Sequence, residues 1–155
     1  DEGALRQGVE AARWPGRMEI LGQSPRFLLD GAHNPAGGEA LAEALTDVTR
    51  ARLLIVAGVM CDKDAEGILS PLLPLAAHVF AVSPRVERAM ASGDLATVCN
   101  ACGVASTNAG AVADGLAMAR NAAEPDDLIL VCGSLFTVGE ARAILLSDSF
   151  EPCRG

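Results

Sequence analysis

The stretch "FLLDGAHNPAGGEALAEAL", residues 27–45, decides the fold class of this chain. Its first residues are apolar, as in a buried strand, whereas from Pro35 onward the apolar residues recur every three or four positions, as along one face of a helix. Asn34 suits the capping position before that helix, and Pro35 suits its first turn. The stretch therefore predicts a strand that runs directly into a helix, with Asp, His and Asn side chains at the junction.

The same alternation of strand-like and helix-like segments continues along the chain. Continuous apolar runs predict strands that are buried on both faces, and helical spacing predicts the segments between them. Such alternation is typical of a mostly parallel sheet covered by helices. We therefore expect an α/β fold, a Rossmann-like three-layer sandwich with about six strands and helices on both faces. The expected strands are residues 17–21, 26–30, 52–58, 78–83, 104–107 and 127–133. The expected helices are residues 1–12, 35–50, 62–76, 95–103, 110–123 and 134–147, and Pro71 should kink the third of them or end it early. We expect a loop or a loop with a short helix at 84–94, and a loose tail from residue 148.

Composition and charge exclude several classes of protein. The 155 residues suffice for one domain, and with 50% apolar but only 3% aromatic residues its core must consist of Ala, Leu, Val and Ile. The net charge is −8 and the arginines are scattered without a basic stripe, which argues against a nucleic-acid partner. Five cysteines, an odd number, fit a reducing compartment. No signal peptide, membrane-spanning run or lipidation motif is visible, so we expect a cytoplasmic protein without a membrane partner.

Three polar clusters follow expected strands. They are residues 30–34 (DGAHN), 62–64 (DKD) and 133–134 (GS). In open parallel sheets, ligands bind outside the carboxyl ends of the strands. Each cluster also precedes a helix N-terminus, where free backbone N–H groups and the helix dipole favour anions. The pattern predicts a site for a phosphorylated or carboxylated ligand.

Each cluster also has a purely structural explanation. Asn34 and Ser134 could be simple helix caps, and the two aspartates of residues 62–64 could cap while Lys63 is solvated. His33 could be a structural histidine with satisfied hydrogen bonds. Asp30 is harder to explain in this way, because a carboxylate at the end of a strand needs partners.

The chain lacks the motif that would hold the phosphates of ATP by itself. It contains no G-x-x-x-x-G-K-[ST] loop, and its one lysine, Lys63, is not in such a loop. The C-x-x-C of Cys99 and Cys102 has neither a second pair nor nearby histidines, so no metal site is predicted. If the protein uses ATP, another domain must bind most of the phosphates.

Four blocks of sequence, taken together, resemble the C-terminal domain of folylpolyglutamate synthase/dihydrofolate synthase, a group within the Mur ligase superfamily. The resemblance identifies residues 14–150 as a Mur ligase C-terminal domain, residues 1–13 as a remnant of the linker or central domain and residues 151–155 as a loose tail. The blocks occur in the family's order: "WPGRMEIL" (14–21), "FLLDGAHNPAGGEALAEAL" (27–45), "GVMCDKDAEGIL" (58–69) and "GSLFTVGEAR" (133–142).

The resemblance implies an ATP-dependent ligase reaction. ATP and Mg²⁺ activate the terminal carboxylate of a folate or of dihydropteroate as an acyl phosphate, and the amine of L-glutamate then attacks to form an amide. ATP and Mg²⁺ are expected to be bound mainly by the N-terminal/central ATPase domain of the same parent chain. The C-terminal domain is expected to close over ATP, to help bind glutamate, and to be inactive alone.

The resemblance also implies roles for individual residues. Arg17 would contact nucleotide phosphate, and Asp30 would accept hydrogen bonds from the ribose hydroxyls. His33 would face the reacting phosphate or the glutamate, so His33 and Asp30 are the candidate catalytic residues. Asn34 would hold its turn and contact the nucleotide, and Ser134 would bind the glutamate carboxylate. No metal ligand and no role for Lys63 follow from the resemblance.

Two other functions remain open at this point. The chain could belong to another amide ligase of the Mur type, such as a peptidoglycan-precursor ligase, although "DGAHNP" with "GSLF" argues against it. It could also be a stand-alone module that binds a nucleotide or an amino acid. The sequence leaves open whether the parent makes dihydrofolate, extends polyglutamates or does both, because the folate pocket is expected in the other domain.

Overall fold

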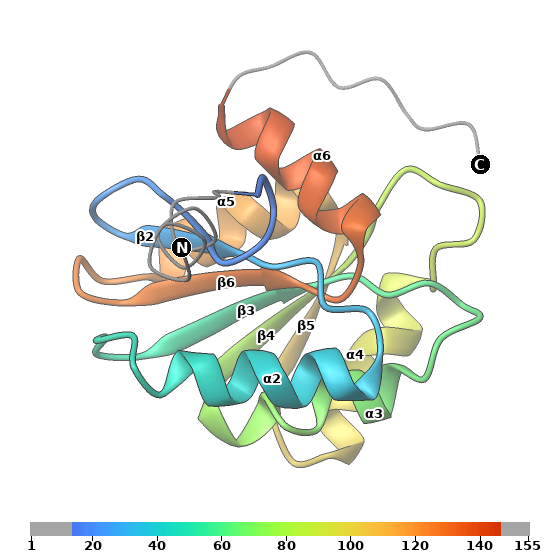
Figure 1. The fold of residues 1–155 in the computed structure, drawn as a ribbon. Helices are drawn as coiled ribbons and strands as arrows, with labels where there is room; N and C mark the ends of the chain where they lie inside the picture. Colours follow the sequence, from blue (N-terminus) through green and yellow to red (C-terminus); the bar gives the residue numbers. More distant parts are fainter. Residues whose placement is uncertain (1–13, 147–155) are drawn as a thin grey trace, which may run out of the picture.

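The computed structural model describes residues 14–146, and these residues form one six-stranded sheet with helices on both faces (Figure 1). The strand order is β1-β2-β6-β3-β4-β5; only β1 and β2 pair antiparallel, and the other neighbours are parallel. This confirms the expected mostly parallel sheet. The elements are β1 (Glu19–Leu21), β2 (Arg26–Leu29), α2 (Pro35–Leu45), β3 (Leu53–Ala57), α3 (Ala65–Leu69), η1 (Leu73–Leu75), β4 (Ala76–Ser83), α4 (Ser92–Ala101), β5 (Ser106–Ala111), α5 (Val112–Ala122), β6 (Leu128–Cys132) and α6 (Leu135–Leu145).

The helix expected at 1–12, the tail expected from 148 and the segments assigned to 1–13 and 151–155 lie outside the described residues. The boundaries of the expected domain therefore stay predictions. Among the helices of residues 14–146, none has both the length and the apolar character that a membrane crossing requires.

The sheet separates two apolar cores. Along β6, Leu128, Leu130 and Cys132 face the core beneath α2, α3 and α4, whereas Ile129 and Val131 face the core beneath α5 and α6. The alternation follows from the pleat of a strand, and both faces are apolar because both are covered. The three-layer arrangement explains why the central strands are continuous apolar runs in the sequence.

The predicted helix at 62–76 was wrong in its extent. Helix α3 ends at Leu69, a short 3-10 turn follows, and β4 begins at Ala76 instead of 78. Pro71 has no N–H to continue the helix, and the amide of Leu72 instead donates to the carbonyl of Leu69 at 2.8 Å. The expected early end at Pro71 is therefore confirmed.

Three other boundaries differ from the prediction by three residues or more, and further ones differ by one or two. Helix α2 ends at Leu45 and not at Arg50, because the Arg50 guanidinium donates to the carbonyl of Leu45 at 2.6 Å and so satisfies the end of the helix. Helix α4 begins at Ser92, three residues before the predicted start. Strand β5 extends to Ala111, past Gly110, whose φ of +75° accompanies a shift in register against β4.

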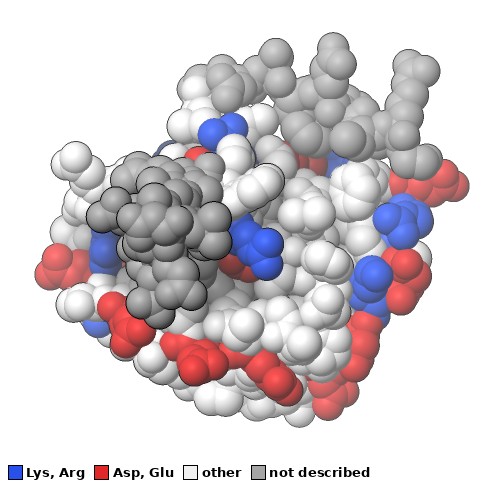
Figure 2. All heavy atoms as spheres, viewed as in Figure 1, with Lys and Arg blue, Asp and Glu red and all other residues white. Residues whose placement is uncertain are grey.

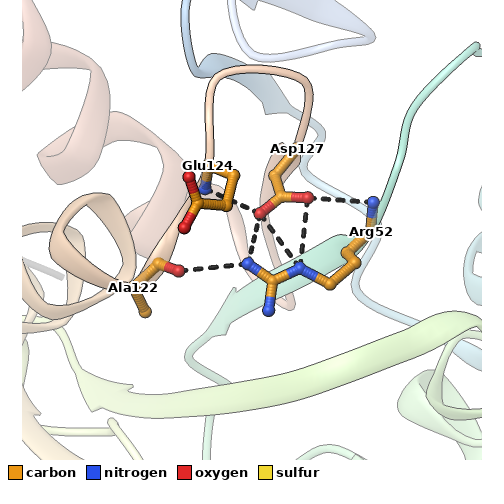
Figure 3. Close-up of polar contacts among 4 residues, drawn as sticks. All are labelled: Arg52, Ala122, Glu124 and Asp127. Carbon is orange, nitrogen blue, oxygen red and sulfur yellow. Dashed lines mark hydrogen bonds and ion pairs between the residues drawn. The ribbon is translucent and has the colours of Figure 1, made fainter.

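A buried carboxylate fastens the amino ends of β3 and β6, opposite the edge at which ligands are expected (Figure 3). Asp127, 1% exposed, accepts the Arg52 guanidinium at 2.5 Å, the Arg52 backbone N–H at 3.0 Å and the Glu124 N–H at 2.8 Å. The hydrogen bond from the Arg52 side chain is the main reason that the pKa of Asp127 lies below its ordinary value; burial opposes it. These contacts join the two strands at the edge of the sheet away from the expected site, so we assign them to stability.

The charges on the surface are unevenly spread. On the face in Figure 2, acidic side chains gather along the side where Figure 1 places α2, and the basic side chains are scattered. The exposed acidic residues of α2 and the turn after it include Glu39, Glu43 and Asp47. This face carries no basic stripe of the kind that binds nucleic acid.

Candidate functional site

A cavity of about 680 Å³ opens at the carboxyl end of β2, between the turn that precedes β1 and the start of α2. Four of the five predicted site residues line it together: Arg17, Asp30, His33 and Asn34. The predicted Ser134 is not among the lining residues. Sequence reasoning also missed the apolar part of the wall, to which Trp14, Met18, Leu41 and Leu135 contribute.

Arg17 is the last residue of a tight turn that begins at Trp14. The Arg17 N–H donates to the Trp14 carbonyl at 3.1 Å, Pro15 takes the second position and Gly16 takes the third with a φ of +73°. Pro and a positive-φ Gly at these positions are characteristic of a type II turn. Arg17 is exposed and forms no ion pair within residues 14–146.

Asp30 fastens this turn to the end of β2. One carboxylate oxygen accepts the N–H of Met18 at 3.1 Å, and the other accepts the N–H of Ala32 at 2.9 Å. The N–H of Gly31 in turn donates to the Gly16 carbonyl at 2.9 Å. A carboxylate has about four lone-pair positions, so two bonds leave Asp30 able to accept more.

His33 has a defined tautomer. Its Nδ1 lies 2.9 Å from the Gly31 carbonyl oxygen, and a carbonyl can only accept, so Nδ1 carries a proton. The other ring nitrogen, Nε2, is then an acceptor in the neutral ring and a donor in the imidazolium. The exposed ring can therefore offer either function to a ligand.

Asn34 caps helix α2, as the structural explanation predicted. Its Oδ1 accepts the Gly37 N–H at 2.7 Å. The first turn of α2 contains no acidic side chain, so its dipole is not offset by a carboxylate of the helix itself. The cap leaves the amide NH₂ of Asn34 available as a donor beside the cavity.

Ser134 caps α6 and is buried, with 2% of its surface exposed. Its Oγ accepts the Thr137 N–H at 3.1 Å and lies 2.8 Å from the Thr137 hydroxyl, which donates to the Gly58 carbonyl at 2.9 Å. Because that proton goes to Gly58, the Ser134 hydroxyl must donate to Thr137. Ser134 thus locks α6 to the loop after β3, and Leu135 beside it reaches the cavity.

Within residues 62–64, the two aspartates bond to other residues and the lysine faces solvent. Asp64 caps α3 by accepting the Gly67 N–H at 2.9 Å, and Asp62 pairs with Arg88 at 3.2 Å. Arg88 also lies over the ring of Phe136, 5.9 Å from its centroid. Lys63 is exposed and has no ion pair within the described part of the chain.

The site offers no evident metal centre. Residues 14–146 contain no group of three or more His, Cys, Asp or Glu side chains placed to hold a metal ion. The cavity combines a guanidinium that has no ion pair among the described residues, a carboxylate with spare acceptor capacity, an imidazole and an apolar wall. These groups suit a ligand with an apolar ring, hydroxyls and phosphates.

Comparison with known proteins finds relatives over most of the chain. The family described as "Mur ligase, glutamate ligase domain" matches residues 16–135. A probable bifunctional folylpolyglutamate synthase/dihydropteroate synthase of Halobacterium salinarum is 43% identical over 147 residues, which cover 92% of this chain and 17% of that protein. The dihydrofolate synthase/folylpolyglutamate synthase of Escherichia coli is 31% identical over 149 residues, 93% of this chain and 33% of that protein.

Solved structures confirm the three-layer fold. E. coli FolC in complex with DHPP and ADP superposes with a TM-score of 0.83 at 30% identity, over 95% of this chain and 35% of that one. A bifunctional folylpolyglutamate synthase/dihydrofolate synthase with Mn, AMPPNP and L-glutamate bound gives 0.82 at 29% identity, over 94% and 35%. The chain thus spans about a third or less of the length of these relatives.

Proposed function

Since the chain belongs to the Mur ligase family of glutamate ligase domains, we propose that it acts as the C-terminal domain of an ATP-dependent ligase. The ligase joins L-glutamate to a folate, to dihydropteroate or to both. The observation that carries the proposal is the gathering of Arg17, Asp30, His33 and Asn34 around one cavity at the carboxyl end of β2. The names of the relatives favour a folate substrate over a peptidoglycan precursor.

The cavity is the nucleotide side of the site. Arg17 contacts a phosphate of ATP, because its guanidinium is exposed, always charged and free of ion pairs within residues 14–146. Asp30 accepts the ribose hydroxyls with the lone pairs that Met18 and Ala32 leave unused. Asn34 contributes its amide donor next to its helix cap.

His33 is the residue nearest to the chemistry. With Nδ1 held by the Gly31 carbonyl, Nε2 donates to phosphate oxygen when the ring is charged. When the ring is neutral, Nε2 accepts a proton from the amine of the incoming glutamate. Both roles serve the attack of that amine on an acyl phosphate, in which an amide forms and inorganic phosphate leaves.

The start of α6 is the glutamate side of the site. Helix α6 presents the unbonded N–H groups of its first turn, which favour a carboxylate. To bind that carboxylate, the Ser134 hydroxyl donates to it in place of the Thr137 hydroxyl. The Ser134 oxygen still accepts the Thr137 N–H and so continues to cap α6. Because Ser134 is buried, its hydroxyl reaches the carboxylate only after it turns away from Thr137.

The other half of the site is proposed to lie in a further domain of the parent chain. The described residues supply neither a phosphate-binding loop nor a cluster of metal ligands, so ATP and Mg²⁺ are bound mainly by that domain. When bound there, Mg²⁺ supplies charge stabilisation to the phosphates. Positioning both substrates needs both domains, so this chain alone is expected to turn over no substrate.

An NMR titration tests the proposal. We expect ADP or L-glutamate, each at about 1–10 mM as befits a half-site, to shift the amides of residues 30–34 and of 134–137 respectively. His33→Ala should weaken the first response and Ser134→Ala the second, whereas His78→Gln, on the only other histidine, should change neither. Equal responses in His33→Ala and His78→Gln would overturn the assignment of His33.

A further inference from the structure

Helix α6 holds the turn that carries Arg17, through contacts that are far apart in sequence. The Glu19 carboxylate accepts the Gly16 N–H at 2.8 Å within the turn region. The same carboxylate accepts the Arg142 Nε–H from α6, at 3.0 Å to Oε2 and 3.2 Å to Oε1. The Glu19 side chain is 20% exposed and that of Arg142 33%, so this pair is better shielded from solvent than the ion pair of Arg88 with Asp62.

A second contact joins the same two elements. Gly16 is buried, and a Cβ at this position would lie 2.8 Å from Cγ1 of Val138. Val138 and Arg142 are four residues apart and therefore lie on the same face of α6. Ser134 is four residues before Val138, so Ser134, Val138 and Arg142 lie along one face of α6. This face begins with the residue that caps the helix and ends with the residue that pairs with Glu19.

We propose that Glu19 and Arg142 are positioning residues: they hold the turn Trp14–Arg17 against α6 and thereby set the place of Arg17 at the cavity. The part of this inference that concerns ligand binding rests on the proposed role of Arg17 in binding phosphate. Glu19 acts through the Gly16 N–H, and Arg142 acts through Glu19. Helix α6 then joins the proposed glutamate end of the site to the proposed phosphate end.

The charge of Glu19 suits its two tasks. Glu19 accepts from the backbone of Gly16 and from the guanidinium of Arg142 at once, and the two oxygens of an ionised carboxyl offer about four lone-pair positions for these bonds. Burial alone would raise the pKa of Glu19, but the hydrogen bonds from Arg142 and Gly16, with the Arg142 charge, hold it below its ordinary value. The carboxylate is therefore ionised at neutral pH.

Amide hydrogen exchange, which needs no ligand, tests the positioning directly. In Glu19→Gln and in Arg142→Met, exchange at Gly16, at Met18 and at Gly31, which bonds to Gly16, should speed up at least about threefold. Exchange at Ile129 and Leu130 in the central strand should stay as in the wild type, which shows that the effect is local. Unchanged exchange at Gly16 and Gly31 in both variants would overturn the proposal, whatever the ligand data show.

Binding measurements then separate positioning from a plain ion pair. ADP affinity should fall about threefold to tenfold in both variants while adenosine, which lacks phosphate, binds as in the wild type. Arg142→Lys should recover part of the loss. The reversed pair, Glu19→Arg with Arg142→Glu, restores an ion pair but no acceptor for the Gly16 N–H, so it should not recover ADP affinity; full recovery would contradict the proposal.

The same data distinguish this inference from the proposed function. If the wild type binds no ADP but exchange at Gly16 and Gly31 responds as expected, the phosphate role of Arg17 fails and the positioning of the turn stands. If ADP binds through Arg17, but amide exchange at Gly16 and Gly31 and the affinity for ADP are the same in both variants as in the wild type, the proposed function stands and the positioning role fails.

Discussion

The carboxylate of Asp30 accepts the backbone N–H of Met18 at 3.1 Å, across twelve residues of sequence. The residue that the family resemblance assigns to the ribose of a nucleotide is thus also the clamp that fixes the turn with Arg17 to the end of β2. One side chain can do both, because its two bonds to the backbone leave lone pairs unused. The same carboxylate therefore links the stability of the turn with the proposed contact to ribose.

The clamp predicts how substitutions of Asp30 affect stability. Asp30→Ala removes both acceptors and should lower the free energy of unfolding by about 1–3 kcal/mol. Asp30→Asn keeps one acceptor oxygen, so its loss should be smaller. Urea unfolding measures both, with Asp126→Ala at an exposed position as the control. A stability of Asp30→Ala equal to that of the control would show that the clamp contributes nothing.

Two glycines, one at the β6–α6 junction and one within α6, predict opposite effects of one substitution. Gly133 has a φ of +106°, and a Cβ there would lie 2.5 Å from the carbonyl oxygen of Gly58. Gly133→Ala should therefore destabilise by roughly 2–4 kcal/mol. Gly139, within α6, has no atom within 4 Å of such a Cβ, so Gly139→Ala should stabilise by up to about 1 kcal/mol.

Thermal unfolding of the two alanine variants checks this pair. Destabilisation of both would mean that α6 does not tolerate a side chain at Gly139 either. Tolerance of Gly133→Ala would contradict the close approach of the two loops after β3 and β6.

The network in Figure 3 predicts a dependence of stability on pH. Because the folded pKa of Asp127 is depressed, chiefly by the hydrogen bond from Arg52, its stabilisation is fully present above the unfolded pKa. It is lost as the pH falls through the folded pKa, that is, from about pH 4 downward. Arg52→Met should thus destabilise at pH 7 and differ less from the wild type near pH 2.

Urea unfolding at several pH values measures this difference. Asp62→Asn breaks an exposed ion pair with Arg88 and should show little effect at any pH. A constant gap between Arg52→Met and the wild type from pH 7 to pH 2 would contradict the assigned role of Asp127.

The sequence predicted what depends on neighbouring residues. Asn34 and Pro35 marked the start of α2, and the apolar run before Asp30 marked β2, because caps and periodicity are local. Pro71 marked the end of α3 for the same reason. The ends of α2 and β5 were not predicted. The side chain of Arg50, five residues after Leu45, satisfies the end of α2, and Gly110 has a positive φ where β5 continues.

Contacts between distant residues could not be predicted in this way. Glu19 and Arg142 are 123 residues apart, and nothing in their local sequence pairs them. The gathering of Arg17 with Asp30 and His33 followed only from the family resemblance. The burial of Ser134 and the bond from Thr137 to the Gly58 carbonyl required the packing of α6 against the loop after β3, which a sequence does not display.

Fluorescence of the single tryptophan tests the central claim most directly, because Trp14 lines the cavity and is 69% exposed. ADP titrated to about 10 mM should change the Trp14 emission with saturation, and Arg17→Ala should weaken the apparent affinity about tenfold while Arg120→Ala leaves it unchanged. That result would support a nucleotide site at the end of β2. Emission that ADP leaves unchanged, or equal affinities in Arg17→Ala and Arg120→Ala, would contradict it.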